Sequence, residues 1–376
     1  MKKSTKFLIT FLFLFQLALN SQTAYKNKND RNPLEWPFST KSIWNMPIGS
    51  KAVYVDAKLQ PALISNMTVD EDYIVMTPNE QLMEIYKSDA GWSRKKSRCE
   101  KTGDLLYSVP IPQNFIVSPK TWNGATPNAG IAVLMPDGRT IKQNQPFAHC
   151  EDVNYATTGY LFEDQDIYGN GLYGAHGGSG LSAIGGTLRV GELTPTSGPI
   201  RHALKINLFG SKNIYYDCET KGYRWPACKS DDYAEKYYYK ERTYPIVKAC
   251  RMGALLALPA KLNIDSLKLE TEPAKILAKA FQDYGAYIVD DTFWDVNAIA
   301  TEWGPNGRFS EEFEKNWGFK MSHQSIDHPW SRDIEKIFAK LHVVDNNSAT
   351  SIGGGGIPRA PLAPKLKAPK LKKIKP

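Results

Sequence analysis

The side chains most able to do chemistry gather in and after one glycine-rich stretch. Residues 168–208 hold ten glycines, and they also carry His176, Glu192, Arg201 and His202. Two further carboxylates, Asp290 and Asp291, end a later apolar run. Glycine allows tight turns, positive φ and close backbone approach. We therefore predict that these six side chains are the site residues and that the stretch is a compact turn feeding two strands.

The types of these residues suit the cleavage of a polysaccharide. Glycoside hydrolysis generally needs two carboxylates, and Glu192, Asp290 and Asp291 are the candidates. A polysaccharide lyase needs a His or Tyr base and polar or cationic groups around a uronate carboxylate. The residues that would supply the lyase set are His176, Arg201, His202, Gln145 and the tyrosine-rich residues 215–244. Sequence spacing leaves lyase and hydrolase chemistry unresolved.

Each candidate also has a structural interpretation. His176 lies among small residues, which favours exposure to a ligand, although a hydrogen bond to a turn backbone fits equally well. His202 alternates with Ile200 and Leu204 in a predicted strand, so it shares the apolar face and is typical of a core histidine. Arg201 would point the other way, as a surface ion-pair partner does.

Common cofactor and nucleophile motifs are absent or lack their context. Residues 169–174 spell GxGxxG, but a dinucleotide site needs a preceding strand and a following helix. The serine at 179 fails GxSxG because Leu181 stands where glycine is required. No histidine pair has the spacing of a metalloprotease helix. We therefore predict no cofactor and no metal, although a metal site assembled from distant residues is not excluded.

The charge distribution excludes a nucleic-acid-binding domain. The formal charge is +8, but residues 1–21 and 351–376 carry ten Lys or Arg and no acidic residue. The body between them has 37 basic against 39 acidic residues. The body therefore lacks the excess of basic residues that is typical of a nucleic-acid-binding domain.

The two ends are predicted to be processing and contact segments. Lysines at 2, 3 and 6 precede the apolar run 7–19, which indicates a secretory signal over residues 1–21. No later stretch could span a bilayer, so the protein should be secreted, extracellular or periplasmic, and not an integral membrane protein. Residues 351–376 are predicted to be a disordered basic tail that contacts an anionic surface or remains a solvated extension.

The pattern of elements predicts a mainly β fold. Asp137-Gly138 joins two apolar-bearing arms over residues 130–145 as a hairpin, and residues 187–193 and 199–208 are expected to be strands. Helices are predicted from Pro273 to Gly285, from about Ser310 and from about Ser331. We expect one domain over residues 22–350, an antiparallel jelly-roll-like β-sandwich with a few late helices. A two-domain split near residue 245 is the alternative.

Five cysteines follow the leader, at positions 99, 150, 218, 228 and 250. None lies in a CxxC pair. In an oxidising compartment we expect a Cys218–Cys228 disulfide that closes a short loop. The odd number leaves at least one thiol unpaired.

Several longer segments resemble one known group of sequences. They are GAHGGSGLSAIGGTLRVGEL, GPIRHALKINL, GYRWPA, ALLALP, LETEPAKILA and DYGAYIVDDTFWD. Over residues 129–319 they resemble an uncharacterised family of secreted bacterial proteins. The resemblance implies one homologous domain but brings no activity, so no residue role follows from it.

The sequence therefore predicts a secreted carbohydrate-active protein that cleaves a polysaccharide. The alternative is a non-catalytic glycan-binding or cell-surface protein, because Tyr and Trp rings bind sugars without any chemistry. A polysaccharide or oligosaccharide is the expected partner in both cases.

Overall fold

The computed structural model describes residues 31–63, 65–93, 95–118, 128–241, 245 and 247–369. The predicted leader at residues 1–21 lies outside the described residues, as do the last residues of the tail from 370 onward. Within the described part, no helix is long and apolar enough to cross a membrane.

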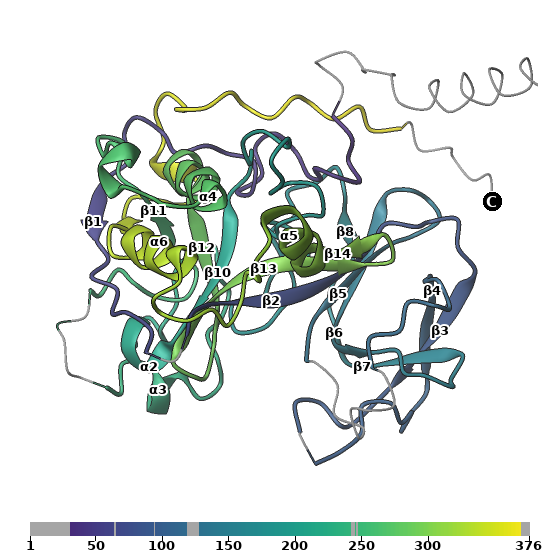
Figure 1. The fold of residues 1–376 in the computed structure, drawn as a ribbon. Helices are drawn as coiled ribbons and strands as arrows, with labels where there is room; N and C mark the ends of the chain where they lie inside the picture. The colour runs from purple at the N-terminus through teal and green to yellow at the C-terminus, as the bar shows by residue number, and fades with distance from the viewer. Residues whose placement is uncertain are drawn as a thin grey trace, which may run out of the picture.

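One mixed sheet of fourteen strands runs through the described part of the chain (Figure 1). Its order is β1-β15-β11-β12-β10-β13-β2-β5-β6-β7-β3-β4, with β14 added beside β13 and β8 beside β6. The strands are β1 Tyr54–Asp56, β2 Ser65–Val75, β3 Leu82–Lys87, β4 Leu105–Pro110, β5 Ile131–Leu134, β6 Thr140–Ala148, β7 Tyr155–Leu161, β8 Gln165–Asp166, β10 Leu204–Leu208, β11 Leu255–Ala257, β12 Ala286–Asp291, β13 Val296–Gly304, β14 Gly307–Arg308 and β15 His342–Val344. Strand β9, Tyr173–His176, meets Leu181 only through single bridges.

The mainly β class is confirmed, because strands make up 27% and helices 14% of the structure. The antiparallel jelly-roll-like sandwich is not confirmed. Four neighbouring pairs, β10 with β12, β13 with β2, β2 with β5 and β3 with β7, are parallel. A boundary near residue 245 would separate paired strands, since β1 pairs with β15 and β2 with β13.

The central sheet packs an apolar core on each face, and on one face polar side chains lie among the apolar ones. Ile206, Ile288 and Ile299 point from β10, β12 and β13 into a core that also holds Phe281 and Ile334 of the covering helices. Those helices are α4 Glu272–Asp283, α5 Phe309–Trp317 and α6 Pro329–Phe338. The shorter helical turns are α2 Gly210–Asn213, α3 Ala234–Tyr237, η2 Ile264–Leu267 and η3 Ile352–Gly354. The glycine-rich stretch covers the opposite face.

Local signals placed several elements correctly. The three predicted helices are confirmed as α4, α5 and α6; Pro273 lies in the first turn of α4, and Gly285 follows it with a φ of 76°. The hairpin is confirmed as β5 and β6, where Asp137 accepts hydrogen bonds from the amides of Arg139 and Thr140.

The strands expected at 187–193 and 199–208 are largely wrong. Strand β10 begins only at Leu204, and residues 187–193 form turns with a single bridge from Leu188 to Thr301. Gly186 and Gly191 have φ values of 77° and 91°, which regular strands do not contain. His202 therefore precedes the strand, and its predicted position on an alternating face does not apply.

The predicted Cys218–Cys228 disulfide is wrong. Both thiols are free and exposed, and the disulfide joins Cys99 to Cys150, whose Cα atoms are 5.8 Å apart. The amide of Cys228 instead donates to the Ser179 carbonyl at 3.1 Å, which fixes this cysteine against the glycine-rich stretch. Closeness in sequence did not indicate closeness in space.

The prediction of a disordered tail from Ser351 is wrong over residues 351–364. Figure 1 shows this yellow segment running beside the purple N-terminal segment. The Gly49 amide donates to Gly353 at 2.8 Å, and the Arg359 amide donates to Ile48 at 3.0 Å. All four glycines at 353–356 have positive φ, so the GGGG run meets a conformational requirement of an ordered turn.

The glycine-rich stretch packs so closely that a single methyl group should disturb it. A Cβ at Gly186 would lie 2.6 Å from the Trp44 ring and 2.9 Å from Cγ of Lys205. We expect Gly186→Ala to lower the free energy of unfolding by about 2 to 4 kcal/mol, from backbone strain and overpacking together. Urea unfolding would measure this loss.

Gly191→Ala is the matched control, because Gly191 also has positive φ but has nothing within 4 Å of its Cβ position. It should cost only about 1 kcal/mol of backbone strain. Equal losses in the two variants would contradict the close packing of Gly186.

Candidate functional site

Four aspartates and a histidine converge on the polar face of the central strands. Asp70 and Asp72 are two residues apart on β2 and therefore share a face, while Asp290 lies near the end of β12. Asp231 comes from the loop before α3. His176 reaches the same region from the end of β9. We name Asp70, Asp72, Asp231 and Asp290 the aspartate cluster.

A fully buried ion pair underlies this cluster. Lys205 is 0% exposed, and its Nζ lies 2.8 Å from Oδ2 of Asp72 while donating to the Ser182 carbonyl at 3.0 Å. Thr187 Oγ1 also donates to Asp72 Oδ2, at 2.7 Å. Burial would raise the pKa of Asp72, but the positive charges of Lys205 and His176 outweigh it and lower the pKa. Burial lowers the pKa of Lys205 despite this pairing.

The predicted exposure of His176 is wrong, because only 4% of its surface is exposed. Its small neighbours let the backbone approach the sheet instead of opening the site to solvent. The Nδ1 atom lies 3.2 Å from Oδ1 of Asp72, so a proton on Nδ1 is donated to that carboxylate. The Nε2 atom has no hydrogen-bond partner among the described residues and lies 3.5 Å from Oδ2 of Asp70.

Asn207 connects the cluster to β10. Its amide Nδ2 donates to Oδ2 of Asp70 at 2.8 Å, across β13. The intervening β13 residue, Ala298, pairs with both Asn207 and Thr68, and its small side chain leaves room for this contact. Asn207 is 5% exposed, and its Oδ1 has no partner among the described residues. The Asp70 side chain is 37% exposed, so solvent reaches this point.

Asp231 and Asp290 both lie close to Gly178. A Cβ at Gly178 would lie 2.6 Å from Oδ2 of Asp231 and 2.9 Å from Oδ1 of Asp290. The amides of Gly178 and Asp291 donate to Asp290 Oδ1 at 3.1 and 2.9 Å. Both carboxyl groups remain partly exposed. Glycine at position 178 therefore leaves the space beside both carboxyl groups free of a side chain.

Both of these carboxyl groups hold protons more tightly than usual. Burial raises the pKa of Asp290 well above its ordinary value, and the negative charges of Asp231 and Asp70 add to the effect. Burial also raises the pKa of Asp231 to about 6, against the hydrogen bond from the Tyr238 hydroxyl. The two carboxyl groups are close enough to titrate as a coupled pair, and the pKa of each is raised.

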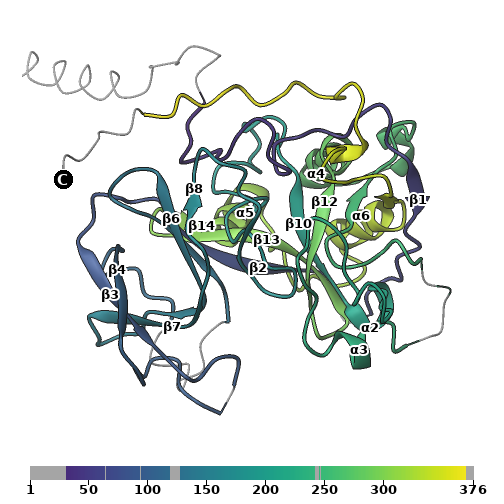
Figure 2. The same ribbon diagram turned by 180° about the vertical axis from the view of Figure 1, so that it is seen from behind.

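Asp291 faces a neighbouring surface of aromatic rings. It accepts hydrogen bonds from the Gly210 amide at 2.8 Å and the Tyr233 hydroxyl at 3.1 Å. Figures 1 and 2 both place α2 and α3 at this end of β10 and β12. Tyr237 stacks on Phe293 with 5.0 Å between ring centres, and Phe293 is 59% exposed. The tyrosine-rich segment thus contributes both ring surfaces and a hydrogen bond to the site.

The other predicted residues form a separate group. His202 Nε2 lies 2.9 Å from Glu192 Oε2, and its Nδ1 lies 2.9 Å from the Ala203 carbonyl oxygen. Burial alone would lower the pKa of His202, but the Glu192 charge raises it. Burial would raise the pKa of Glu192, but the His202 charge lowers it. The two therefore form a buried ion pair.

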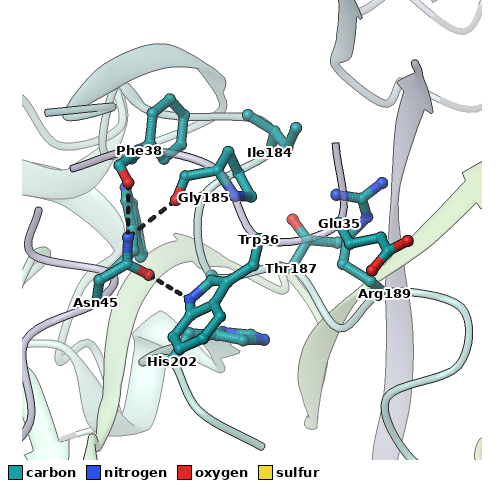
Figure 3. Close-up of a pocket in the computed structure, with 12 residues that line it drawn as sticks. Glu35, Trp36, Phe38, Asn45, Ile184, Gly185, Thr187, Arg189 and His202 are labelled. Carbon is teal, nitrogen blue, oxygen red and sulfur yellow. Dashed lines mark hydrogen bonds between the residues drawn. The ribbon is translucent and has the colours of Figure 1, made fainter. Parts of the chain in front are cut away.

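A small pocket adjoins this ion pair (Figure 3). It encloses about 260 Å³ of empty space including its mouth, and Trp36, Asn45 and His202 lie near one another in its wall. Arg189 lies across from them, held by two hydrogen bonds to Glu302 at 2.8 and 3.1 Å. Arg201 is exposed above the Trp36 ring at 4.8 Å. These contacts are structural, since every charge named here except Arg201 has an oppositely charged partner.

The six predicted residues thus separate into two places. His176, Asp290 and Asp291 lie at or beside the aspartate cluster, whereas Glu192 and His202 lie with Arg201 at the pocket. Gln145 donates to the Asn128 carbonyl and belongs to neither. The residues that the sequence analysis missed are Asp70, Asp72, Lys205, Asn207 and Asp231. The i, i+2 spacing of Asp70 and Asp72, with apolar residues on both sides in the segment MTVDEDYIV, was the available signal.

Comparison with known proteins adds no assignment. No family model matches the chain, and no curated protein or solved structure matches it. Among the described residues, no group of three or more His, Cys, Asp or Glu side chains is placed to hold a metal ion. The residues themselves must therefore carry the functional argument.

The raised pKa of Asp231 should make the protein less stable as the pH rises. Its pKa is 3.8 when unperturbed and about 6 in the fold, so the folded state binds more protons between these values. This contribution to stability is present below about pH 4 and is lost as the pH rises through 6. Asp231→Asn should remove it, so the stability of the wild type relative to the variant should fall by about 2 kcal/mol between pH 4 and 7.

Thermal or urea unfolding across that pH range would measure the difference. Asp89→Asn is the control, because Asp89 is exposed and follows β3, near the end of the strand order that is far from β12. A constant difference between wild type and Asp231→Asn at all pH values would contradict the raised pKa.

Proposed function

We propose that this protein is a secreted glycoside hydrolase that cleaves a polysaccharide. The Asp231 and Asp290 pair around Gly178 carries the proposal. The distances of 2.6 and 2.9 Å to the Gly178 Cβ position set an upper limit of about 5.5 Å between Oδ2 of Asp231 and Oδ1 of Asp290, which is compatible with the carboxyl separation of about 5 to 5.5 Å in retaining glycosidases. The raised pKa values of both carboxyl groups favour a state in which one is protonated and the other ionised, as an acid and nucleophile pair requires.

The environment of each carboxyl group assigns its role. Oδ1 of Asp290 accepts two backbone hydrogen bonds, so Oδ2 carries the proton. Asp290 gives this proton to the glycosidic oxygen, and the bond from that oxygen to the anomeric carbon breaks with its electron pair on oxygen. Asp231 attacks the anomeric carbon and forms a glycosyl ester. Asp290 then takes a proton from water, which hydrolyses the ester and frees Asp231.

Tyr238 and His176 act as positioning residues in this scheme. The Tyr238 hydroxyl donates to Oδ2 of Asp231 and fixes the orientation of the carboxylate. His176 is held by Asp72 through Nδ1, and its Nε2 lies 3.5 Å from Oδ2 of Asp70, so the ring limits where the Asp70 carboxylate can lie. The charge of Asp70 contributes to keeping Asp290 protonated.

The same residues disfavour a lyase. A lyase must neutralise a uronate carboxylate with cationic or hydrogen-bonding donors. Lys205 is the cation beneath the cluster, but it is fully buried and engaged by Asp72 and Ser182. The carboxylates of the cluster would repel a uronate. Of the two chemistries left open by the sequence, hydrolysis therefore fits better.

Non-catalytic glycan binding is the second candidate, and exposed aromatic rings favour it. Tyr233, Phe293 and Trp294 are 36%, 59% and 38% exposed near the aspartate cluster. Such rings supply apolar faces against which sugar rings pack. A binding protein would retain a glycan on these rings without releasing products.

Asp290→Asn should abolish polysaccharide cleavage while preserving the fold. The amide keeps the shape and can accept the two backbone hydrogen bonds, but it cannot donate the acid proton. We expect the release of reducing ends to fall by about 10²- to 10⁴-fold, the usual contribution of a general acid. A panel of neutral, cationic and anionic polysaccharides incubated with the secreted protein would provide the assay.

Wild-type product should also keep the anomeric configuration of the substrate, as proton NMR of fresh product would show. Asp89→Asn, exposed and distant, should cleave like the wild type. Full activity of Asp290→Asn would refute the assigned role. Retention of a glycan without any cleavage by the wild type would favour the binding protein instead.

A further inference from the structure

A loop far from the carboxyl pair exposes two stacked aromatic rings. The loop covers residues 88–104 and joins β3 to β4. Its Trp92 ring stacks on Tyr160 of β7, with 4.6 Å between the ring centres and 27° between the ring planes. Trp92 is 45% exposed, Tyr160 is 49% exposed, and the neighbouring Leu161 is 50% exposed. Large apolar side chains that gather at the surface of a protein indicate a place where another molecule binds.

Several contacts fix this loop in place. Cys99 forms the disulfide with Cys150, and Nε of Arg98 donates to the Gly91 carbonyl at 2.7 Å. The Thr157 hydroxyl of β7 donates to the Arg98 carbonyl. These contacts hold the residue directly before the exposed tryptophan. A ring surface that is already fixed loses less conformational entropy when it binds a partner, so the loop is preorganised.

The same loop carries cations that have no carboxylate partner. Residues 91–99 contain four basic residues and no acidic one, and Asp89 and Glu100 flank this segment as exposed residues. Lys95 and Lys96 are exposed, and neither forms an ion pair with any residue that the structure describes. The Lys87 ammonium lies 5.1 Å from the centre of the tyrosine ring in the stack. The loop therefore combines aromatic surface with positive charge, whereas the body of the chain has 37 basic against 39 acidic residues.

We propose that the Trp92–Tyr160 stack, together with Lys95 and Lys96, binds an anionic polysaccharide that anchors the protein and is not its substrate. Sugar rings pack against aromatic faces, and ammonium groups attract the carboxylates or sulfates of such a polymer. Figures 1 and 2 both show β3 and β7 apart from β10 and β12, the strands beside the carboxyl pair. The anchoring surface is thus separate from the carboxylates that repel an anionic chain. This inference does not depend on the proposed hydrolase activity.

Polygalacturonate and its fully methyl-esterified form are the discriminating polymers, because they share one backbone and differ in charge. The purified full chain should bind polygalacturonate at least about tenfold more tightly than the ester, as affinity electrophoresis at low ionic strength would measure. This preference should shrink as salt is added, because salt screens exposed charges. Equal affinities for the two polymers would overturn the proposal.

Trp92→Ala tests the ring surface. Removing the indole should weaken the binding of both polymers at least about tenfold, since a few large aromatic side chains usually dominate an interface. The melting temperature should change little, because the side chain is 45% exposed. Unchanged binding by this variant would exclude the stack as the binding surface.

The Lys95→Gln, Lys96→Gln double variant tests the charges and leaves the rings in place. It should weaken the binding of polygalacturonate by about tenfold and leave the affinity for the ester nearly unchanged. The matched control is Lys261→Gln, Lys340→Gln, which removes the same charge at exposed positions near β11 and β15, toward the other end of the strand order. An equal loss of affinity in both double variants would trace the binding to net charge and contradict a defined site.

Two further measurements distinguish this surface from the carboxyl pair and from a nucleic-acid site. Asp290→Asn should bind both polymers like the wild type, whether or not the wild type cleaves any glycan. Loss of binding in that variant would place the polymer at the carboxyl pair and refute the separate surface. Single-stranded oligothymidylate should bind more weakly than polygalacturonate of equal charge, and tighter binding of the oligonucleotide would assign the surface to nucleic acid instead.

Discussion

The pairing of Lys205 with Asp72 is the contact on which the polar face of the sheet depends. Lys205 is fully buried, and a buried ammonium group is costly unless it is paired and hydrogen-bonded. Asp72 of β2 supplies the opposite charge, while Ser182 and Thr187 of the glycine-rich stretch complete the hydrogen bonds. Removing either charge leaves the other unpaired, which typically costs about 3 to 5 kcal/mol. The pair therefore fixes two strands and the stretch above them at once.

The two faces of the central sheet differ in polarity, although each carries an apolar core. Ile206, Ile288 and Ile299 pack beneath the helices, where apolar burial provides the main favourable term of folding. That support allows the opposite face to hold carboxyl groups with raised pKa, each of which reduces stability at neutral pH. Short side chains such as Ala298 leave room for polar contacts across this face. Apolar burial on both faces, including Tyr287 and Val289 of β12 beside the site, offsets the cost of these groups.

Caps and turns in the sequence predicted the helices and the hairpin, but they gave no information about contacts between distant segments. The helix after Pro273 and the hairpin at Asp137-Gly138 depend on caps and turns within a few residues, so their sequences sufficed. Lys205 looked like one polar residue of an alternating strand, because its partner Asp72 lies far away in the chain. Asp231 likewise could not be paired with Asp290 from the sequence, because the two meet only beside Gly178 in the fold. The disulfide prediction was wrong for the same reason, since Cys99 and Cys150 are 51 residues apart in the chain.

His176 shows why composition can mislead about exposure. Small neighbours suggested an open histidine, yet glycine also lets a backbone approach a sheet more closely than any other residue does. At Gly177 and Gly178 the chain passes directly against Asp290, and the space that side chains would fill is occupied by carboxylate oxygens. This close approach removes part of the water around the carboxyl pair, and that burial raises both pKa values. The glycines carry no reactive group, but they contribute to the raised pKa values by letting the backbone approach the carboxyl groups closely.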